Sequence, residues 1–98
     1  MIQTEVTVQN SAGFHVRDAS LVCKTAMKYS SEIRLRKGGA VADCKSCLDL
    51  LSLMAPQGTQ LVLTADGADE EAATNEIVKL FNVKFYEDEF ASAAPQRS

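Results

Sequence analysis

The sequence predicts an α+β domain in which a four-stranded antiparallel sheet is covered on one face by three helices. Segments with strand-like alternation and segments with helical periodicity follow one another in the order βαββαβα. A glycine hairpin turn in the middle of this order favours an antiparallel sheet. With 98 residues, the chain supports one hydrophobic core. We expect the domain to span residues 1–88, and residues 89–98, which are small and polar, to form a disordered tail.

The first half of the chain contributes three strands and one helix to this prediction. Its segments are a strand over residues 2–8, a helix over 16–27, a strand over 32–36, a hairpin turn over 37–39 and a strand over 40–43. The first strand alternates apolar and polar side chains, as half-buried strands do. In the helix, apolar residues from Val16 to Met27 recur at helical spacing, and Lys24 and Lys28 lie on the other face.

The second half contributes two helices and the last strand. Its segments are a short apolar helix over residues 46–54, a break at 56–58, a strand over 60–65 and a helix over 69–81. The first turn of the last helix carries Asp69, Glu70 and Glu71. These acidic side chains oppose the positive end of the helix dipole and so mark the start of the helix.

Composition excludes several classes of function. Lysine and arginine total 10 against 13 acidic residues, for a net charge of -3, so no basic surface is available for nucleic acid. No apolar stretch approaches the roughly 20 residues that span a bilayer. The N-terminus lacks the basic-then-apolar order of a signal peptide. We therefore expect a cytoplasmic protein without membrane insertion.

Three cysteines without a secretory signal argue against a disulfide framework. Cys44 and Cys47 have the C-x-x-C spacing of redox and zinc motifs, but the preceding strand is too short for a thioredoxin-like setting. A structural zinc site needs four ligands, and the others available, Cys23 and His15, are distant in sequence. We expect small buried thiols, no metal and no cofactor, with thiol redox chemistry as the last alternative.

The strongest chemical signal is Gly13-Phe14-His15-Val16-Arg17, which contains the only histidine of the chain. His15 falls between a glycine-containing loop and a helix start, where unpaired amides and the helix dipole favour an anion. Imidazole accepts and releases groups near neutral pH, and a guanidinium suits a phosphate. A lone histidine in such a place can also be a solvated loop residue or a helix cap, so the residues alone leave both interpretations open.

The short apolar helix carries a second candidate. Ser46 and Asp49 form a capping-box pattern at the start of this helix. A phosphate on Ser46 would also be favoured there, because it would lie at a helix N-terminus. This helix is mostly apolar and carries Cys47, Leu48 and Leu51 with few polar residues among them. A short helix cannot bury every side, so we expect a mixture of core and exposed docking surface, which Phe14 could join.

Three motifs, in order, resemble the histidine-containing phosphocarrier protein HPr family of the phosphoenolpyruvate-dependent sugar phosphotransferase system. They are Gly13 to Arg17, then Lys45-Ser46 with the helix ending Leu50-Leu51-Ser52-Leu53, and then Ala65 to Glu70. The resemblance covers roughly residues 2 to 85 and implies an open-faced sandwich.

The resemblance implies the following roles. His15 would accept a phosphoryl group from enzyme I, Arg17 would neutralise it, and sugar permease A components would receive it. HPr kinase/phosphorylase would phosphorylate Ser46, and the protein modified in this way could act on a transcriptional regulator. The docking surface would be formed by Phe14, Lys24, Cys47, Leu48 and Leu51. We expect a monomer that forms a transient phosphohistidine rather than a turnover enzyme.

The sequence departs from the family pattern beside both phosphorylation sites. Asp18 stands where the family usually has proline, and Asp49 where it has a small residue. Two unit charges about 6 Å apart interact by roughly 1–3 kcal/mol at a protein surface, so Asp18 should disfavour the phosphohistidine. An alternative function follows, in which the chain is a regulatory interaction protein controlled through Ser46, with weak or absent transfer at His15.

Overall fold

The computed structural model describes residues 1–86. Its elements are β1 (Ile2–Thr7), α1 (Val16–Ala26), β2 (Glu32–Lys37), β3 (Ala40–Asp43), α2 (Cys47–Ser52), β4 (Gln60–Asp66) and α3 (Glu70–Asn82), followed by a short turn over Lys84–Tyr86. The predicted order βαββαβα is confirmed, and the expected tail at residues 89–98 lies outside the described residues.

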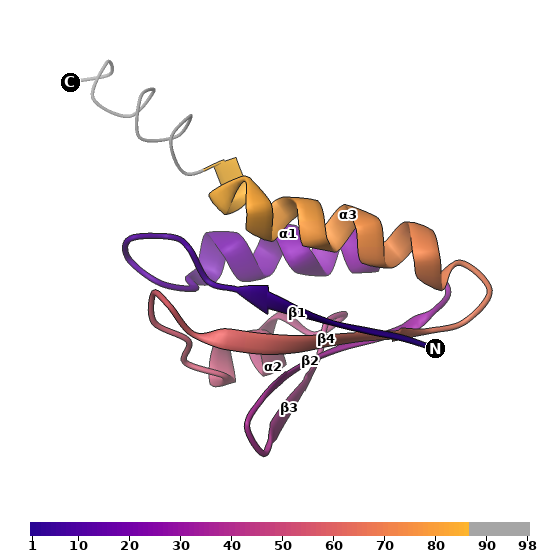
Figure 1. Ribbon diagram of the computed structural model, residues 1–98, viewed down its shortest axis with the longest axis horizontal. Helices are drawn as coiled ribbons and strands as arrows, with labels where there is room; N and C mark the ends of the chain where they lie inside the picture. Colours follow the sequence, from indigo (N-terminus) through magenta and orange to yellow (C-terminus); the bar gives the residue numbers. More distant parts are fainter. Residues whose placement is uncertain (87–98) are drawn as a thin grey trace.

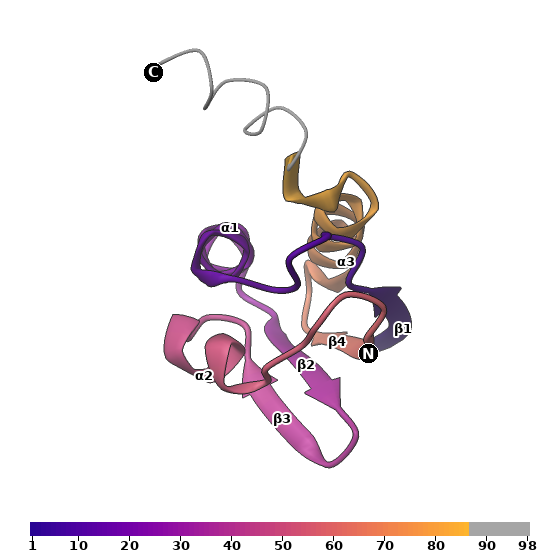
Figure 2. The same cartoon turned by 90° about the vertical axis from the view of Figure 1, so that its left-hand side faces the viewer.

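The four strands form one sheet in the order β1-β4-β2-β3, and every neighbouring pair is antiparallel. β4 is therefore central, and its Leu63 lies opposite Thr4 of β1 and Leu35 of β2. The helices α1 and α3 lie side by side over one face (Figure 1). Figure 2 shows α2 on the same side of the sheet, beside β2 and β3. This is the predicted open-faced arrangement.

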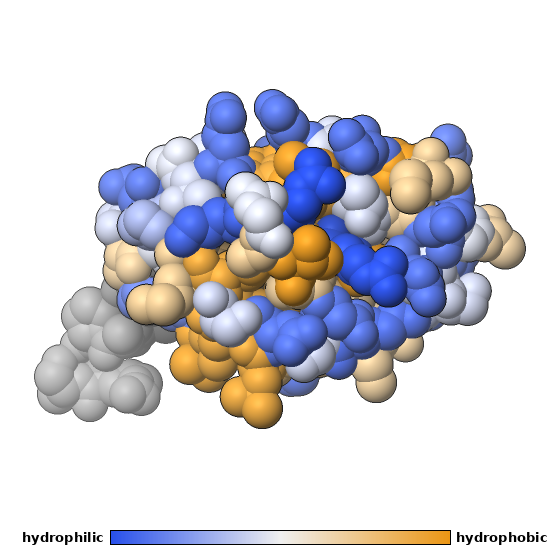
Figure 3. Space-filling view, turned by 90° about the horizontal axis from the view of Figure 1, so that it is seen from below, coloured by the Kyte–Doolittle hydropathy of each residue, from blue (hydrophilic) through white to orange (hydrophobic). Residues whose placement is uncertain are grey.

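Alternation along the strands places one set of side chains under the helices. In β4, Leu61, Leu63 and Ala65 are buried, and the residues between them are only partly buried. The helices contribute Val22 of α1 and Ile77 of α3 to the same core, and both side chains are fully buried. Each large aliphatic side chain buried in this way contributes about 1.5–3 kcal/mol. Figure 3 views the molecule from below, where mostly hydrophilic side chains surround a few apolar ones.

The ends of α1 differ from the prediction. Val16 and Met27 were expected on the buried face of the helix, but they are 63% and 64% exposed. Helical spacing alone assigned them to that face, whereas the buried stripe of α1 runs through Asp18, Ala19, Val22, Thr25 and Ala26, and Val16 and the C-cap Met27 lie to one side of it. Val16 and Met27 therefore belong to the molecular surface.

A carboxylate joins the two loops at the end of the sheet away from His15. Asp69, the N-cap of α3, accepts hydrogen bonds from the backbone N–H groups of Ser30 at 2.8 Å and Ser31 at 3.0 Å, and from both serine hydroxyls. The Ser31 hydroxyl, followed by the Ser30 amide, lowers the pKa of Asp69 to about 2. These hydrogen bonds join the α1–β2 loop to the start of α3. Because they favour the ionised form of Asp69, they are strongest when its carboxyl group is deprotonated.

We predict an acid-sensitive contribution of Asp69 to stability. Its pKa falls from 3.8 in the unfolded chain to about 2 in the fold, so the contribution is complete above pH 4 and is lost as the pH falls from about 4 to about 2. Chemical denaturation at a series of pH values should show a shallower acid-induced loss of stability in Asp69→Asn. The control Asp66→Asn, which removes an exposed carboxylate, should keep the wild-type slope; equal slopes for Asp69→Asn and wild type would contradict the assignment.

Candidate functional site

His15 is the N-cap residue of α1, and its side chain is exposed. The loop that leads to it is fixed by two backbone hydrogen bonds, from the Gly13 N–H to the Asn10 carbonyl at 3.0 Å and from the Phe14 N–H to the Ala55 carbonyl at 2.9 Å. The imidazole therefore stands at the positive end of a helix dipole, next to amides with no partner inside the helix.

Gly13 allows this approach for two reasons. Its φ of +89° lies in the left-handed region, which favours glycine. A Cβ placed there would lie 3.1 Å from the Ala55 carbonyl oxygen and 3.2 Å from the Pro56 Cα, both backbone atoms. The loop before His15 therefore packs directly on the segment after α2, and no larger residue fits without displacement.

Phe14 anchors the loop from below and does not join a docking surface. The ring is only 7% exposed, stacks on Phe81 of α3 and meets the edge of Phe85 with 5.7 Å between ring centroids. Phe14 was expected on the exposed docking surface, but the structure buries its ring, which ties the site to the core.

Asp18, at the third position of α1, is 2% exposed and lies between His15 and Arg17. Its Oδ2 accepts the backbone N–H of His15 at 2.9 Å, and its Oδ1 lies 3.2 Å from Nη2 of Arg17. The carboxylate therefore accepts the backbone N–H of the N-cap residue, as the N3 side chain of a capping box does, and engages the cation expected to neutralise a phosphate. A buried carboxylate needs such partners, because an isolated charge away from water is strongly disfavoured.

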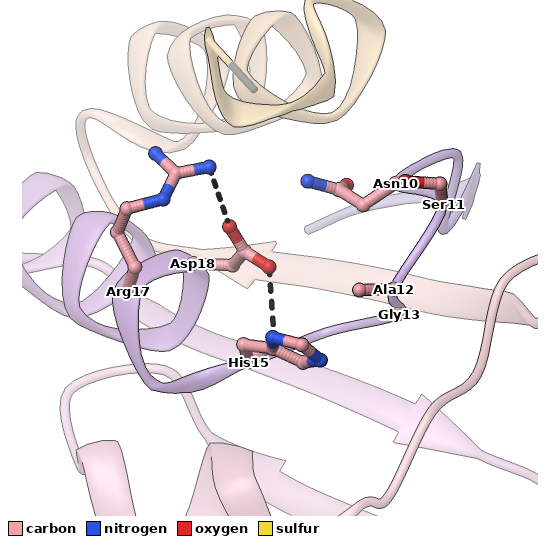
Figure 4. A pocket seen from close by; sticks show the side chains of 7 residues that line it. All are labelled: Asn10, Ser11, Ala12, Gly13, His15, Arg17 and Asp18. Carbon is pink, nitrogen blue, oxygen red and sulfur yellow. Dashed lines mark hydrogen bonds and ion pairs between the residues drawn. The ribbon is translucent and has the colours of Figure 1, made fainter. Parts of the chain in front are cut away.

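Arg17 is turned away from His15. Its Nη1 donates to the backbone carbonyl of Phe85 at 2.6 Å, after the end of α3. In Figure 4 the guanidinium lies on the far side of the Asp18 carboxylate from the histidine. In this position the guanidinium is directed at Asp18 and Phe85 and not at the His15 ring.

These side chains border a hollow of about 310 Å³. Its lining residues are Asn10, Ser11, Ala12, Gly13, His15, Arg17 and Asp18 (Figure 4). Asn10 was not singled out from the sequence, because an asparagine in a loop has no distinctive signal. In the structure it is 3% exposed and its Nδ2 donates to the Lys84 carbonyl at 3.0 Å. The left-handed turn Lys84–Tyr86 was also not anticipated, since none of its residues is glycine.

Ser46 is the N-cap of α2, and its Oγ accepts the backbone N–H of Asp49 at 3.3 Å. The reciprocal half of the capping box is displaced, because the Asp49 carboxylate accepts the N–H of Asp43 at 3.3 Å instead of that of Ser46. At the other end of the short helix, Lys37 donates to the carbonyls of Leu53 and Met54. Side chains thus fix both ends of α2.

The expected docking residues lie on α1 and α2, which pack against each other. Leu48 is 81% exposed, Lys24 is exposed, and Cys47 and Leu51 are half-buried against the core. Met54, just beyond α2, adds an exposed apolar side chain. The mixture of core and surface that was expected for α2 is what its burial pattern gives.

Of the three cysteines, Cys44 offers little thiolate. Cys44 is fully buried, and its burial, with smaller effects of Asp43 and Cys23, raises its pKa to about 12. Cys23 and Cys47 are free and partly buried. Within residues 1–86, no group of three or more His, Cys, Asp or Glu side chains is placed to hold a metal ion. No helix in this part of the chain is long and apolar enough to cross a membrane.

An exposed histidine at a helix N-cap, on an open-faced βαββαβα sandwich, defines the class of histidine phosphocarrier domains, and three comparisons agree. A family model described as the PTS HPr component phosphorylation site matches residues 2–83. The phosphocarrier protein HPr of Treponema pallidum (strain Nichols) is 35% identical over 88 residues, covering 90% of this chain and 100% of the relative. That of Haemophilus influenzae is 40% identical over 80 residues, covering 82% and 94%.

A solved structure gives the same result. The crystal structure of HPr-C-His from Thermoanaerobacter tengcongensis has a TM-score of 0.83 and 36% sequence identity, covering 87% of this chain and 96% of that one. This chain belongs to the HPr family of phosphocarrier proteins of the phosphotransferase system. The expected family and fold are confirmed, whereas the monomeric state stays a prediction.

We predict that Gly13→Ala destabilises the fold more than Gly58→Ala. Both glycines have φ near +90°, but an added Cβ at Gly58 meets nothing within 4 Å. The left-handed strain, about 1–3 kcal/mol, is therefore common to both variants. Urea denaturation should show a larger loss of unfolding free energy for Gly13→Ala, with the excess due to the contact with Ala55 and Pro56. Equal losses would show that this contact does not constrain the loop.

Proposed function

We propose that this protein relays a phosphoryl group from phosphorylated enzyme I through His15 to sugar permease A components. The observation that carries the proposal is the exposed imidazole at the N-terminus of α1. A phosphate on that ring would lie near unpaired helix amides and the positive end of the dipole, both of which stabilise an anion.

Phosphoryl transfer to and from His15 requires few other groups of the protein. The lone pair of an unprotonated ring nitrogen of His15 attacks the phosphorus atom, a nitrogen–phosphorus bond forms, and the bond to the donor breaks. The same exchange in the next step passes the group to the acceptor. The protein must hold the phosphoryl group without burying it, so an exposed ring fixed by a rigid loop suits the task.

The N-terminus of α1 is already partly occupied in the resting state. Asp18 accepts the His15 amide and pairs with Arg17, so a phosphate on His15 must compete with a carboxylate for the same donors. A charge about 6 Å away disfavours the phosphate by roughly 1–3 kcal/mol, which weakens the phosphohistidine without preventing it. We therefore expect a carrier whose phosphorylated form is less stable than that of a site with an uncharged residue here.

The second candidate function is regulatory, with Ser46 as the site modified by HPr kinase/phosphorylase. The engagement of Arg17 by Asp18 favours it, because this contact opposes transfer at His15. Ser46 caps α2, whose backbone N–H groups would donate to a phosphate, but Asp43 and Asp49 bring carboxylates to the same turn. In either case Lys24, Cys47, Leu48 and Leu51 would form the surface that enzyme I, the permease components or the kinase contact.

We predict that incubation with phosphoenolpyruvate and cognate enzyme I gives an acid-labile phosphate on the wild-type chain. His15→Ala should take no acid-labile label, and Ser46→Ala, the matched control, should keep it. Intact-mass measurement before and after brief acid treatment distinguishes the two kinds of phosphate, since phosphohistidine hydrolyses and phosphoserine survives.

The same assay separates the two functions. Absence of acid-labile phosphate in the wild type contradicts the carrier role. Acid-stable phosphate after incubation with ATP and HPr kinase/phosphorylase, lost in Ser46→Ala, would then support the regulatory role.

A further inference from the structure

The segment after α3 has an unusual backbone. Lys84, Phe85 and Tyr86 have φ values of 53°, 52° and 60°, so three successive residues other than glycine occupy the left-handed region. Each such residue is strained, and the conformation persists only where surrounding contacts impose it. We call Lys84–Tyr86 the C-terminal turn.

Two side chains from the N-terminal part of the chain contact this turn and support its conformation. Asn10 donates to the Lys84 carbonyl at 3.0 Å, and Arg17 donates to the Phe85 carbonyl at 2.6 Å. The Phe85 ring is fully buried against Phe14 and Phe81. The turn is thus held by one ring in the core and two donors at the candidate site.

The hold exerted by Asn10 is incomplete. The Oδ1 atom of Asn10 is buried and has no hydrogen-bond partner. The free-energy cost of this unpaired acceptor offsets part of the stabilisation from the hydrogen bond that Nδ2 donates. The bond from Arg17 is charge-assisted, and such bonds are stronger than neutral ones. Of the two polar contacts that hold the turn, the one from the Arg17 guanidinium is therefore the stronger.

We propose that Arg17 couples the phosphorylation state of His15 to the conformation of the C-terminal turn. In the resting protein the guanidinium holds the Phe85 carbonyl and the Asp18 carboxylate. A phosphoryl group on His15 attracts the guanidinium more strongly than a neutral carbonyl does, and Arg17 then leaves Phe85. The turn loses the stronger of its two polar restraints and relaxes toward ordinary backbone angles.

This inference rests on the proposed function, and it adds a second state to it. The two states are a resting form with the turn held and a phosphorylated form with the turn released. Coupling of this kind is reciprocal, so a contact that holds the turn also disfavours the phosphohistidine. A protein that contacts the released segment would distinguish the loaded carrier from the empty one.

The Tyr86 amide reports on the turn, because in the resting structure it donates to the Val83 carbonyl at 2.9 Å. Hydrogen exchange of this amide, measured on the full chain, should become about tenfold faster in Arg17→Met, the equivalent of one charge-assisted hydrogen bond. Arg34→Met is the matched control: it removes an arginine whose side chain pairs with Glu32 on the sheet, and it should leave the exchange unchanged.

Phosphorylation of the wild type should produce a similar acceleration, with the label on His15 confirmed by intact mass. Phosphorylated Arg17→Met should show no further acceleration. A labelled wild-type chain whose Tyr86 exchange is unchanged would overturn the coupling while leaving the carrier function intact. A chain that takes no label contradicts the proposed function itself. Unchanged exchange in Arg17→Met would overturn the role of Arg17 in holding the turn, whatever the labelling result.

Discussion

The arrangement of the site depends on one buried carboxylate. Asp18 is removed from water and must find partners, and it finds them in the His15 amide at 2.9 Å and the Arg17 guanidinium at 3.2 Å. The first contact fixes where α1 begins and thereby where the imidazole stands. The second keeps the guanidinium away from the ring. One side chain therefore both builds the helix start and competes with the phosphate that the helix start would bind.

The consequences extend beyond the histidine. Because Arg17 is held near α3, its Nη1 donates to the Phe85 carbonyl and supports a left-handed turn next to the site. Phe85 in turn packs on Phe14, the residue before the histidine. The loop, the helix start and the end of α3 are therefore joined by direct contacts.

Periodicity and turn residues predicted the fold well, because strands in a half-buried sheet and amphipathic helices leave local patterns. The same reasoning failed for Val16 and Met27, since the spacing of apolar residues does not by itself reveal which side of a helix faces the sheet. It also misassigned Phe14, because burial under α3 is a long-range contact. For Asp18 the sequence indicated a helix cap and a charge near His15, but its pairing with Arg17, and the bond from Arg17 to Phe85, depend on side-chain rotamers that no local pattern encodes.

The claim that Asp18 and a phosphate compete for the same donors is tested most directly by the equilibrium of phosphoryl transfer. Asp18→Asn keeps an acceptor for the His15 amide but removes the charge. At a fixed ratio of phosphoenolpyruvate to pyruvate, with enzyme I present, its ratio of phosphorylated to unphosphorylated protein should rise about fivefold or more, the equivalent of roughly 1 kcal/mol. Asp49→Asn, which removes the corresponding charge from α2, should leave the ratio unchanged. An unchanged or lower ratio for Asp18→Asn would contradict the account.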